Sequence, residues 1–522
     1  MKDDDGVPTP LGSAVRWVLL ALAAAVMVVS AAAIVAGTAR MRASFPGPGW
    51  PFSPLVPFAE VHLPDAAGWW RYVIHREIAW SVALVVAVLA LQRVPRALRG
   101  RIAAGIVLLQ AVLLGLAFSV RLPFNGGQYL YVAYGELVQQ GYNPYDPPLR
   151  GEPVSPQLRA IATLWGIQAE GNTDPPTRIV MRDRYGPAYT LGVAAALLPF
   201  RHADVETQAR AIRLWSALAM VGCSILLWFL LPKARWSCAA LAAFALNPVV
   251  VMQTAMGGHN DVVALLFGLG ACAAASRGRF AAAGVVAALS IATKVTFAPF
   301  LLPFLIVAWA VRGWRGALAG GTALAATLVA VALPFGLART YVQAPADAHS
   351  FNFSYLVSLA HAASRHVPGV HVPASVFGTA YVLLIAAAAA AVALAAARRT
   401  RVPLLEAALL LLIFSGSKYL PWYATVLAPL VLVRAPWSIA LFLGISLAEQ
   451  VFGRRDFLGA IDDMPFLAFV GLAAAGSAAI FLVQRLLDSG STFTGLRWPR
   501  APRGPTELVG GTGVNPVGSL HG

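Results

Sequence analysis

Long apolar runs separated by short polar connections dominate this sequence. The first run, Ala14 to Gly37, is longer than the core of a signal peptide, so we expect an uncleaved membrane helix. Runs of roughly 20 apolar residues cross a bilayer as helices. The pattern therefore predicts an all-α integral membrane protein, a polytopic bundle of about 13 to 15 transmembrane helices. The further spans are expected near residues 76–92, 102–120, 211–231, 236–255, 260–276, 281–296, 297–312, 316–335, 374–397, 403–416, 420–433, 437–452 and 465–485.

One apolar run is too short for an ordinary span. Pro187 to Phe200 is a stretch of about 14 residues, which favours a re-entrant or partly inserted helix over a full crossing. The chain then divides into a transmembrane domain, residues 14–486, and two ends that we expect to be disordered, residues 1–13 and 487–522.

Composition and charge agree with a membrane protein. Hydrophobic residues make up 58% of the chain and charged residues 12%, against about 25% charged in soluble proteins, which excludes a soluble globular enzyme. The net charge of +16 would suggest nucleic acid in a soluble chain, but here the arginines cluster in short connections, which is the positive-inside pattern. We therefore expect no nucleic-acid partner. The three cysteines are not spaced as metal ligands.

The basic clusters set the expected orientation in the plasma membrane. Connections rich in arginine and lysine are expected on the cytoplasmic side, together with both termini. These clusters are Arg93, Arg96, Arg99 and Arg101; Lys233 and Arg235; Arg277 and Arg279; Arg312 and Arg315; and Arg398, Arg399 and Arg401. The segments placed on the outer face are 38–75, 121–186, 256–261, 336–373, 417–420 and 453–464.

The outer segment 121–186 begins with a polar and aromatic motif. Residues 125–148 read NGGQYLYVAYGELVQQGYNPYDPP, and positions 128–140 have helical spacing with Tyr131, Gly135 and Val138 on one face. This predicts a helix at the membrane surface, ended by the turn at Asn143-Pro144. An aromatic interfacial helix capped by this turn, with no functional role, is the preferred explanation of the motif taken alone.

Two further motifs carry polar groups at membrane boundaries. Asn247-Pro248 is followed by Met256-Gly-Gly-His-Asn-Asp261, where Asn260 or Asp261 either caps the next helix or belongs to a functional site. Lys294 interrupts an apolar run, and a lysine at mid-helix costs about 3 kcal/mol on insertion scales. It either snorkels to the interface or pairs with a phosphate on a lipid-linked substrate.

A fourth motif, Ser417-Lys-Tyr-Leu-Pro-Trp-Tyr423, stands at an expected outer helix start. Its aromatic residues are typical of a membrane-interface anchor. Lys418 beside Trp422 and Tyr423 also suits a sugar or phosphate site.

The order of these motifs resembles the actinobacterial α-mannosyltransferases of the GT-C type, which use polyprenyl-phosphate mannose. The resemblance covers about residues 100 to 435, and Gly-Gly-His-Asn-Asp is its most specific part. It implies a GT-C-like fold and transfer of a hexose from a polyprenyl phosphate to a lipid or polysaccharide acceptor on the outer face. Mannose is the hexose that the resemblance implies. An outer carboxylate would act as general base and cations would stabilise the leaving phosphate.

The chain departs from this family at the position of the usual catalytic Asp, where it has Gly127. Either Glu136 or Asp261 replaces that base, or a shifted alignment brings Asp146 or Asp183 to it, or the protein binds a lipid-linked sugar without transferring it. A non-catalytic binding or assembly subunit therefore stays an alternative. A polyprenyl-phosphate-sugar flippase is another, although few polar residues beyond Lys294, Glu406 and Glu449 lie within the spans.

The expected site draws on all four motifs. Glu136 and Asp261 are the catalytic candidates. The expected partners are a polyprenyl-phosphate sugar donor, a glycolipid or polysaccharide acceptor and membrane lipid. No cofactor is indicated, and the sequence leaves a need for a divalent metal open. The substrate-binding candidates are His259 and Asn260 for sugar hydroxyls, Lys294 and Lys418 for the donor phosphate, and Tyr129, Tyr131, Asn143, Tyr145, Trp422 and Tyr423 for the pocket.

Overall fold

A computed structural model describes part of the chain. The described residues are 13–43, 66–120, 127–149, 153–159, 161, 182–183, 185–231, 235–294, 297, 301–343, 436–452 and 466–489. Within these ranges the secondary structure is helical and no β-strand is present, which confirms the predicted all-α class.

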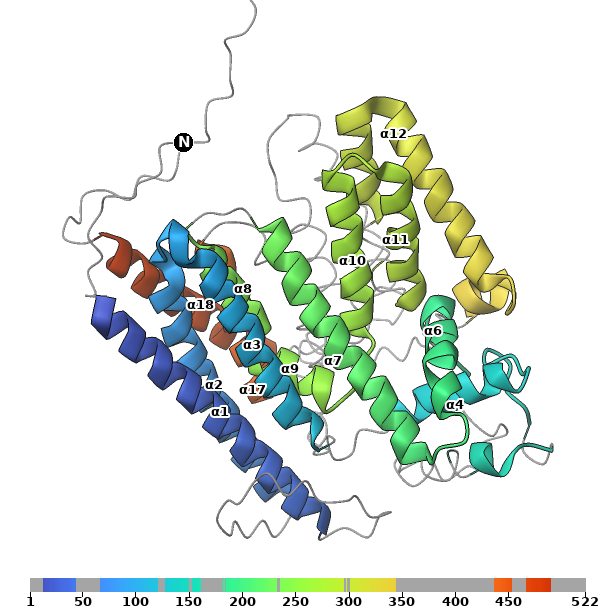
Figure 1. Ribbon diagram of the computed structural model, residues 1–522, viewed down its shortest axis with the longest axis horizontal. Helices are drawn as coiled ribbons and strands as arrows, with labels where there is room; N and C mark the ends of the chain where they lie inside the picture. The colour runs from blue at the N-terminus through green and yellow to red at the C-terminus, as the bar shows by residue number, and fades with distance from the viewer. Residues whose placement is uncertain are drawn as a thin grey trace, which may run out of the picture.

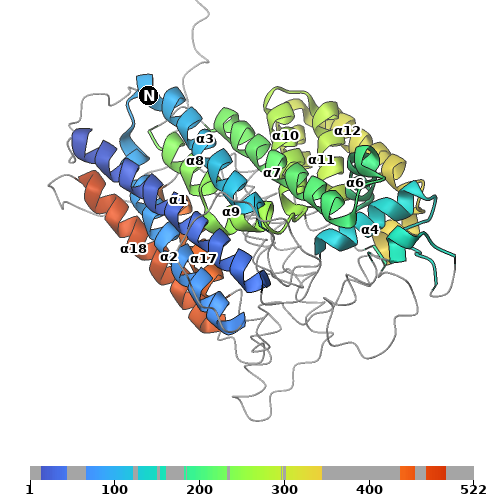
Figure 2. The same cartoon turned by 60° about the horizontal axis from the view of Figure 1, so that its bottom comes forward.

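The first and last described helices form one side of the molecule. The N-terminal pair is α1 (Ser13–Ala43) and α2 (Ala66–Ala90), which pack along each other. The C-terminal pair, α17 (Pro436–Phe452) and α18 (Phe466–Ser489), lies beside them, with α17 against α2 (Figure 2). The chain thus returns at its end to the helices with which it begins.

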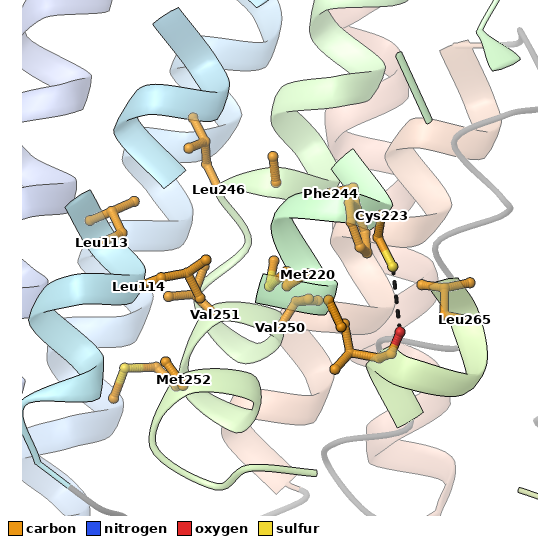
Figure 3. Packing of buried hydrophobic residues seen from close by; sticks show 14 of the residues in the cluster. Leu113, Leu114, Met220, Cys223, Phe244, Leu246, Val250, Val251, Met252 and Leu265 are labelled. Carbon is orange, nitrogen blue, oxygen red and sulfur yellow. Dashed lines mark hydrogen bonds between the residues drawn. The ribbon is translucent and has the colours of Figure 1, made fainter. Parts of the chain in front are cut away.

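The central layer holds the most deeply buried apolar residues. It consists of α3 (Arg99–Phe118), α7 (Val205–Leu230) and two short helices, α8 (Ser237–Ala245) and α9 (Pro248–Ala255). Leu113 and Leu114 of α3, Met220 of α7 and Val251 of α9 belong to one buried cluster, with Cys223 Sγ donating to the carbonyl of Val262 at 3.4 Å (Figure 3). This core supports the connection that follows α9.

The opposite side of the molecule is built from later helices. Figure 1 shows α10 (Asp261–Ser276) and α11 (Phe280–Thr293) side by side, with α12 (Leu301–Ala332) next to α11. The shorter α4 (Gly127–Gln139) and α6 (Pro187–Leu197) pack against each other and against α7. The π-helical segment Arg339–Gln343 follows α12.

Five described helices are long and apolar enough to cross a membrane, and a bent pair, α8 with α9, would make six. Three expected spans differ in detail. The run 236–255 is broken at Asn247-Pro248, with a bend of 44°. The runs 297–312 and 316–335 meet at Gly313 in α12, where φ is +63° and the helix is kinked. The run 187–200 is a helix of 11 residues followed by a 3₁₀ turn, in line with the expected short element.

Other expectations compare as follows. The helix predicted at 128–140 is present as α4, and its residues from Gln128 to Leu137 are buried within the protein, so its place at the membrane surface stays a prediction. The tail expected from residue 487 is still helical to Ser489. The spans 374–397, 403–416 and 420–433, the N-terminal residues 1–12 and the tail beyond 489 lie outside the described residues.

The two ends of the bundle differ in charge. Arg213 lies beside Gly258 and Gly222 lies beside Leu266, so α7 and α10 run in the same direction. The basic connections after α7 and α10 therefore lie at one end. Cys238 Sγ contacts the carbonyl of Arg99, which places the start of α3 there too. The connection between α9 and α10 lies at the other end.

Candidate functional site

The connection between α9 and α10 is shaped by local sequence. Asn247 caps α9 by accepting hydrogen bonds from the backbone N–H of Val249 and Val250, and Pro248 takes the first helical position. The helix ends at Ala255, and Gly258 has φ +67°, a conformation that favours glycine. Asn247-Pro248 is thus a helix start, and the Gly-Gly pair turns the chain toward His259, Asn260 and Asp261.

A buried arginine holds this connection in place. Arg213 of α7 is fully buried, and its Nε donates to the carbonyl of Ala255 at 2.8 Å. Its Nη2 donates to the carbonyls of Phe118 and Val120 at the end of α3. The Cα hydrogens of Gly258 face the Arg213 side chain, where a Cβ would collide with Cγ. Arg213 therefore ties the ends of α3 and α9 together.

The centre of the site is a buried ion pair. Lys294 Nζ donates to Asp261 Oδ1 at 2.6 Å, with 9% of the lysine side chain and 1% of the aspartate side chain exposed. The sequence suggested a mid-helix lysine, and this is wrong: α11 ends at Thr293, and Lys294 has extended backbone dihedrals (φ −152°, ψ 116°). The helix end lets the lysine turn toward the start of α10.

The carbonyl of Thr293 joins three segments beside this pair. It accepts hydrogen bonds from Gly186 N at 3.2 Å and from Asn260 Nδ2 at 3.4 Å. Gly186 packs directly on the backbone of Ala292, where any Cβ would overlap the carbonyl group. The start of α6, the end of α11 and the start of α10 therefore meet at one point.

Aromatic rings form a wall next to the ion pair. The ring of Tyr131 in α4 meets Tyr185 at 4.9 Å and Tyr189 at 5.0 Å, both edge to face. Tyr189 stacks on Trp215 of α7 at 5.4 Å with an interplanar angle of 8°. The phenols of Tyr131 and Tyr189 are close enough to Asp261 to be influenced by its charge.

Several buried polar atoms around the pair have no hydrogen-bond partner among the described residues. They are Asp261 Oδ2, Asn260 Oδ1 and the Tyr189 hydroxyl. Gln253 Oε1 in α9, the helix before the connection, likewise has no partner among the described residues. A buried polar atom without a partner costs about 1–3 kcal/mol, so such a group of atoms is typical of a place where a polar ligand binds.

His259 lies in the connection itself, between the two helices. Burial, and then the neighbouring charge of Lys294, lowers the pKa of its imidazole from 6.5 to about 3. The side chain is therefore neutral in the physiological range and can donate from one ring nitrogen and accept at the other.

Two candidates from the first outer motif have different partners. Glu136 Oε1 accepts from Gln208 Nε2 at 2.7 Å and from Gln157 Nε2 at 3.4 Å, and Oε2 accepts from Gln140 Nε2 at 3.2 Å. The hydroxyl of Tyr129 donates to Glu206 near the start of α7. Both side chains thus connect α4 to α7 and its surroundings, and neither is brought to the Lys294–Asp261 pair by these contacts.

The Asn143-Pro-Tyr-Asp146 motif forms a structural junction. Asn143 Oδ1 accepts from Tyr145 N at 3.0 Å, and its Nδ2 donates to the carbonyl of Phe335 at 3.0 Å. The Tyr145 hydroxyl donates to the carbonyl of Tyr185 at 2.7 Å. Asp183, buried, accepts from Tyr185 N and from the Thr190 hydroxyl. Asp146 pairs with Arg339 at 3.5 Å in a half-exposed position. The junction fixes the start of α6 beside the site.

Lys418, Trp422 and Tyr423 lie outside the described residues, so their place relative to the ion pair stays a prediction. Among the described residues, no group of three or more His, Cys, Asp or Glu side chains could hold a metal ion.

Sequence reasoning missed Arg213, Tyr189 and Gln253. Arg213 had a usable signal, because it is an arginine followed by a long apolar run rather than part of a basic cluster. Tyr189 and Gln253 had none, since single polar or aromatic residues within apolar runs are common at helix contacts.

Part of the chain that contains this site is similar to a known protein family. Residues 188–420 match glycosyltransferase family 87. The family 87 region contains Tyr189, Arg213, the 256–261 connection and Lys294. It begins after α4, so Tyr131 and Glu136 are outside it.

A curated relative supports the same class. The chain is 28% identical over 196 residues to an alpha-(1->6)-mannopyranosyltransferase A of Mycobacterium tuberculosis, and the match covers 36% of this chain and 33% of that protein. The chain thus spans about a third of the length of this relative. No solved structure matches. Together the two matches confirm the resemblance to the actinobacterial GT-C mannosyltransferases, and the apolar helices are those of a multi-pass membrane protein.

Proposed function

We propose that the protein is a membrane glycosyltransferase that moves a hexose from a polyprenyl-phosphate donor to a lipid or polysaccharide acceptor. Mannose is the hexose that we propose. The observation that carries this proposal is the buried Lys294–Asp261 pair, at 2.6 Å, with the second carboxylate oxygen unpaired among the described residues. A charged pair inside an apolar bundle is expensive and is typical of a functional site. The pair lies within the family 87 region.

The reaction is an inversion at the anomeric carbon. An acceptor hydroxyl attacks that carbon, the bond to the phosphate oxygen breaks, and polyprenyl phosphate leaves with the bonding electrons. Asp261 Oδ2 accepts the proton of the attacking hydroxyl, since a hydroxyl is a weak nucleophile without a base. Lys294, whose ammonium group donates to Asp261, is proposed to stabilise the negative charge of the leaving phosphate. Lys418 is proposed to contact the same phosphate.

Asp261 is preferred over Glu136 as the base because of their partners. Glu136 receives three side-chain amide donors, which use its carboxylate to hold α4 against its neighbours. His259 is neutral, and with Asn260 it is proposed to bind sugar hydroxyls. Tyr131, beside Tyr189, is proposed to line the sugar site, while Tyr129, Asn143 and Tyr145 support its walls.

Orientation follows from the charge difference between the two ends. The short basic connections lie at the end opposite to the ion pair, and such connections face the cytoplasm in most membrane proteins. This supports a site on the outer face of the plasma membrane, with both termini inside and the donor presented in the outer leaflet.

A non-catalytic binding subunit is the second candidate. It is favoured by Gly127, the first residue of α4, which stands where the resembled family has its catalytic Asp. The helix start would accept an aspartate, because acidic residues are stabilising at helix N-termini.

A transfer assay tests the proposal. Purified protein in detergent receives radiolabelled polyprenyl-phosphate mannose and a membrane-lipid extract as acceptor. We expect transfer by the wild type and a loss of at least about a hundredfold in Asp261→Asn, since removing a general base costs 10²–10⁴-fold. Glu136→Gln is the matched control. Per amount of folded protein, it should keep most of the transfer activity of the wild type. Transfer that survives Asp261→Asn would remove Asp261 as base.

A Gly127→Asp variant separates the two candidate functions. If the wild type binds the donor without transferring it, and Gly127→Asp transfers, the natural protein is a binding subunit. If the wild type transfers and Gly127→Asp changes the rate little, the base has moved to another residue.

A further inference from the structure

Tyr189 is a buried tyrosine enclosed by other aromatic rings. Its ring is stacked on Trp215 at 5.4 Å and is touched edge-on by Tyr131 at 5.0 Å, and only 1% of the residue is exposed. Its hydroxyl is nevertheless buried without a hydrogen-bond partner among the described residues. Buried tyrosine hydroxyls usually find a partner. The missing partner is therefore expected to come from a ligand.

The position of Tyr189 is fixed relative to the ion pair. It stands in the first turn of α6, whose start is bound to the end of α11 through Gly186 N and the Thr293 carbonyl. The same carbonyl accepts from Asn260, the neighbour of Asp261. The hydrogen bonds to the Thr293 carbonyl thus hold the start of α6, which carries Tyr189, next to the start of α10, which carries Asp261. A ligand bound at Asp261 would therefore lie close to Tyr189.

The unpaired atoms define the chemistry of that ligand. Asp261 Oδ2 and Asn260 Oδ1 accept hydrogen bonds, and the Tyr189 hydroxyl donates one and accepts others. A phosphate carries few protons to donate and would meet a carboxylate, and a metal cation would meet the ammonium group of Lys294. A neutral group with several adjacent hydroxyls satisfies all three atoms, because each hydroxyl both donates and accepts.

We propose that Tyr189 is a substrate-contacting residue that, with Asp261 Oδ2 and Asn260 Oδ1, binds the hydroxyl groups of a sugar ring, while the phosphate lies on the Lys294 side. This inference rests on the proposed transferase function and deepens it, because it assigns the sugar hydroxyls and the phosphate to different residues. The hydroxyls belong either to the donor sugar or to an acceptor sugar, and the test distinguishes these sources.

The test measures binding to the full-length protein in lipid nanodiscs. The three probes are radiolabelled polyprenyl-phosphate mannose, polyprenyl phosphate without a sugar, and a short alkyl mannoside. Tyr189→Phe removes one hydroxyl and keeps the stacked ring. The matched control is Tyr134→Phe, because the Tyr134 hydroxyl donates to the carbonyl of Arg182 at 3.1 Å and so has a protein partner.

We expect Tyr189→Phe to weaken binding of the mannosyl donor about three- to tenfold, the range of one hydrogen bond, and to leave the sugar-free lipid phosphate unchanged. Tyr134→Phe should leave the ratio of the two affinities unchanged. A loss confined to the alkyl mannoside supports the inference with the acceptor as the source of the hydroxyls.

Two results overturn the inference. Tyr189→Phe that binds all three probes as the wild type does, or that loses the sugar-free lipid as strongly as the mannosyl donor, shows that the hydroxyl does not recognise sugar. A wild type that binds none of the three probes overturns the proposed function itself, and this failure is recognised before any variant is compared.

Discussion

At the scale of single residues, the site combines opposite charges with unpaired oxygens. A buried ion pair is stable only when both partners are present, and removal of one leaves an uncompensated charge. Asp261 and Lys294 are 33 positions apart and are joined only because α10 and α11 form a hairpin whose open end lies at the site. The fold therefore contributes the pair, and the second carboxylate oxygen of Asp261 has no partner in the part of the chain that the structure describes.

His259 gives a prediction for the pH dependence of stability. Its pKa is about 3 in the folded protein, against 6.5 ordinarily, so below pH 6.5 the unfolded chain binds a proton that the folded chain does not. The His259 imidazole therefore leaves the free energy of unfolding unchanged above pH 6.5 and lowers it progressively as the pH falls below 6.5. At pH 5 the loss is about 2 kcal/mol for this one group.

The measurement compares melting temperatures in detergent at pH 7.5 and pH 5. His259→Gln should lose less on acidification than the wild type, because glutamine has no proton to bind. His202→Gln is the control, since that imidazole is exposed beside Arg201. If His259→Gln and the wild type lose the same amount, the imidazole is not held neutral by burial.

The sequence identified part of the site residue by residue. His259, Asn260, Asp261 and Lys294 were chosen because polar groups in apolar surroundings are costly, and the structure brings Asp261 and Lys294 together. Glu136 was chosen as a replacement for the catalytic Asp that the resembled family has at the position of Gly127, but its amide partners come from positions 140, 157 and 208. The partners at positions 157 and 208 are distant along the chain, and such contacts leave no mark in a single sequence.

At the scale of elements, close backbone contact decides how α6 meets α11. Gly186 has φ −77° and ψ 152°, which any residue adopts, so its small size and not its flexibility is what the position requires. A Cβ there would overlap the carbonyl of Ala292, which is backbone and cannot turn away.

Gly186→Ala should therefore push α6 away from α11. Overpacking costs about 1–3 kcal/mol, and here the displacement also breaks the hydrogen bond to Thr293. We expect a lower melting temperature and weaker donor binding. Gly105→Ala in α3 is the control, because no atom lies within 4 Å of an added Cβ and an alanine stabilises a helix by about 0.5–1 kcal/mol. Equal melting temperatures for the two variants would contradict this account.

Hydropathy located the described helices but not their breaks. The expected spans 102–120, 260–276 and 437–452 correspond to α3, α10 and α17. The expected span 236–255 is two helices, because both halves are apolar and a hydropathy window does not register the change of direction. The signal was Asn247-Pro248, since the residue before a proline avoids the helical region.

At the scale of the whole molecule, charge and chemistry separate along the bundle axis. The connection after α10 carries Arg277 and Arg279, and the start of the same helix carries Asp261. The connection between α6 and α7 lies at the site end, because α7 and α10 run in the same direction and the start of α10 carries Asp261. Because the basic connections and the ion pair lie at opposite ends, the side of the membrane that one end faces determines the side that the other faces. Labelling one exposed position at each end tests both assignments.

The last prediction uses a membrane-impermeant thiol reagent on oriented vesicles. Ala97→Cys and His202→Cys are made separately in a variant whose Cys223, Cys238 and Cys272 are alanine, and both positions are exposed. If basic connections face the cytoplasm, the His202→Cys protein is labelled in right-side-out vesicles and the Ala97→Cys protein only in inside-out vesicles. The reverse pattern would place the ion pair on the cytoplasmic side and would contradict the proposed site on the outer face. Labelling of both positions from one side would contradict the assignment of the two ends. The expected pattern supports a donor in the outer leaflet, because the lipid-linked sugar and the Asp261–Lys294 pair would then lie on the same side of the membrane.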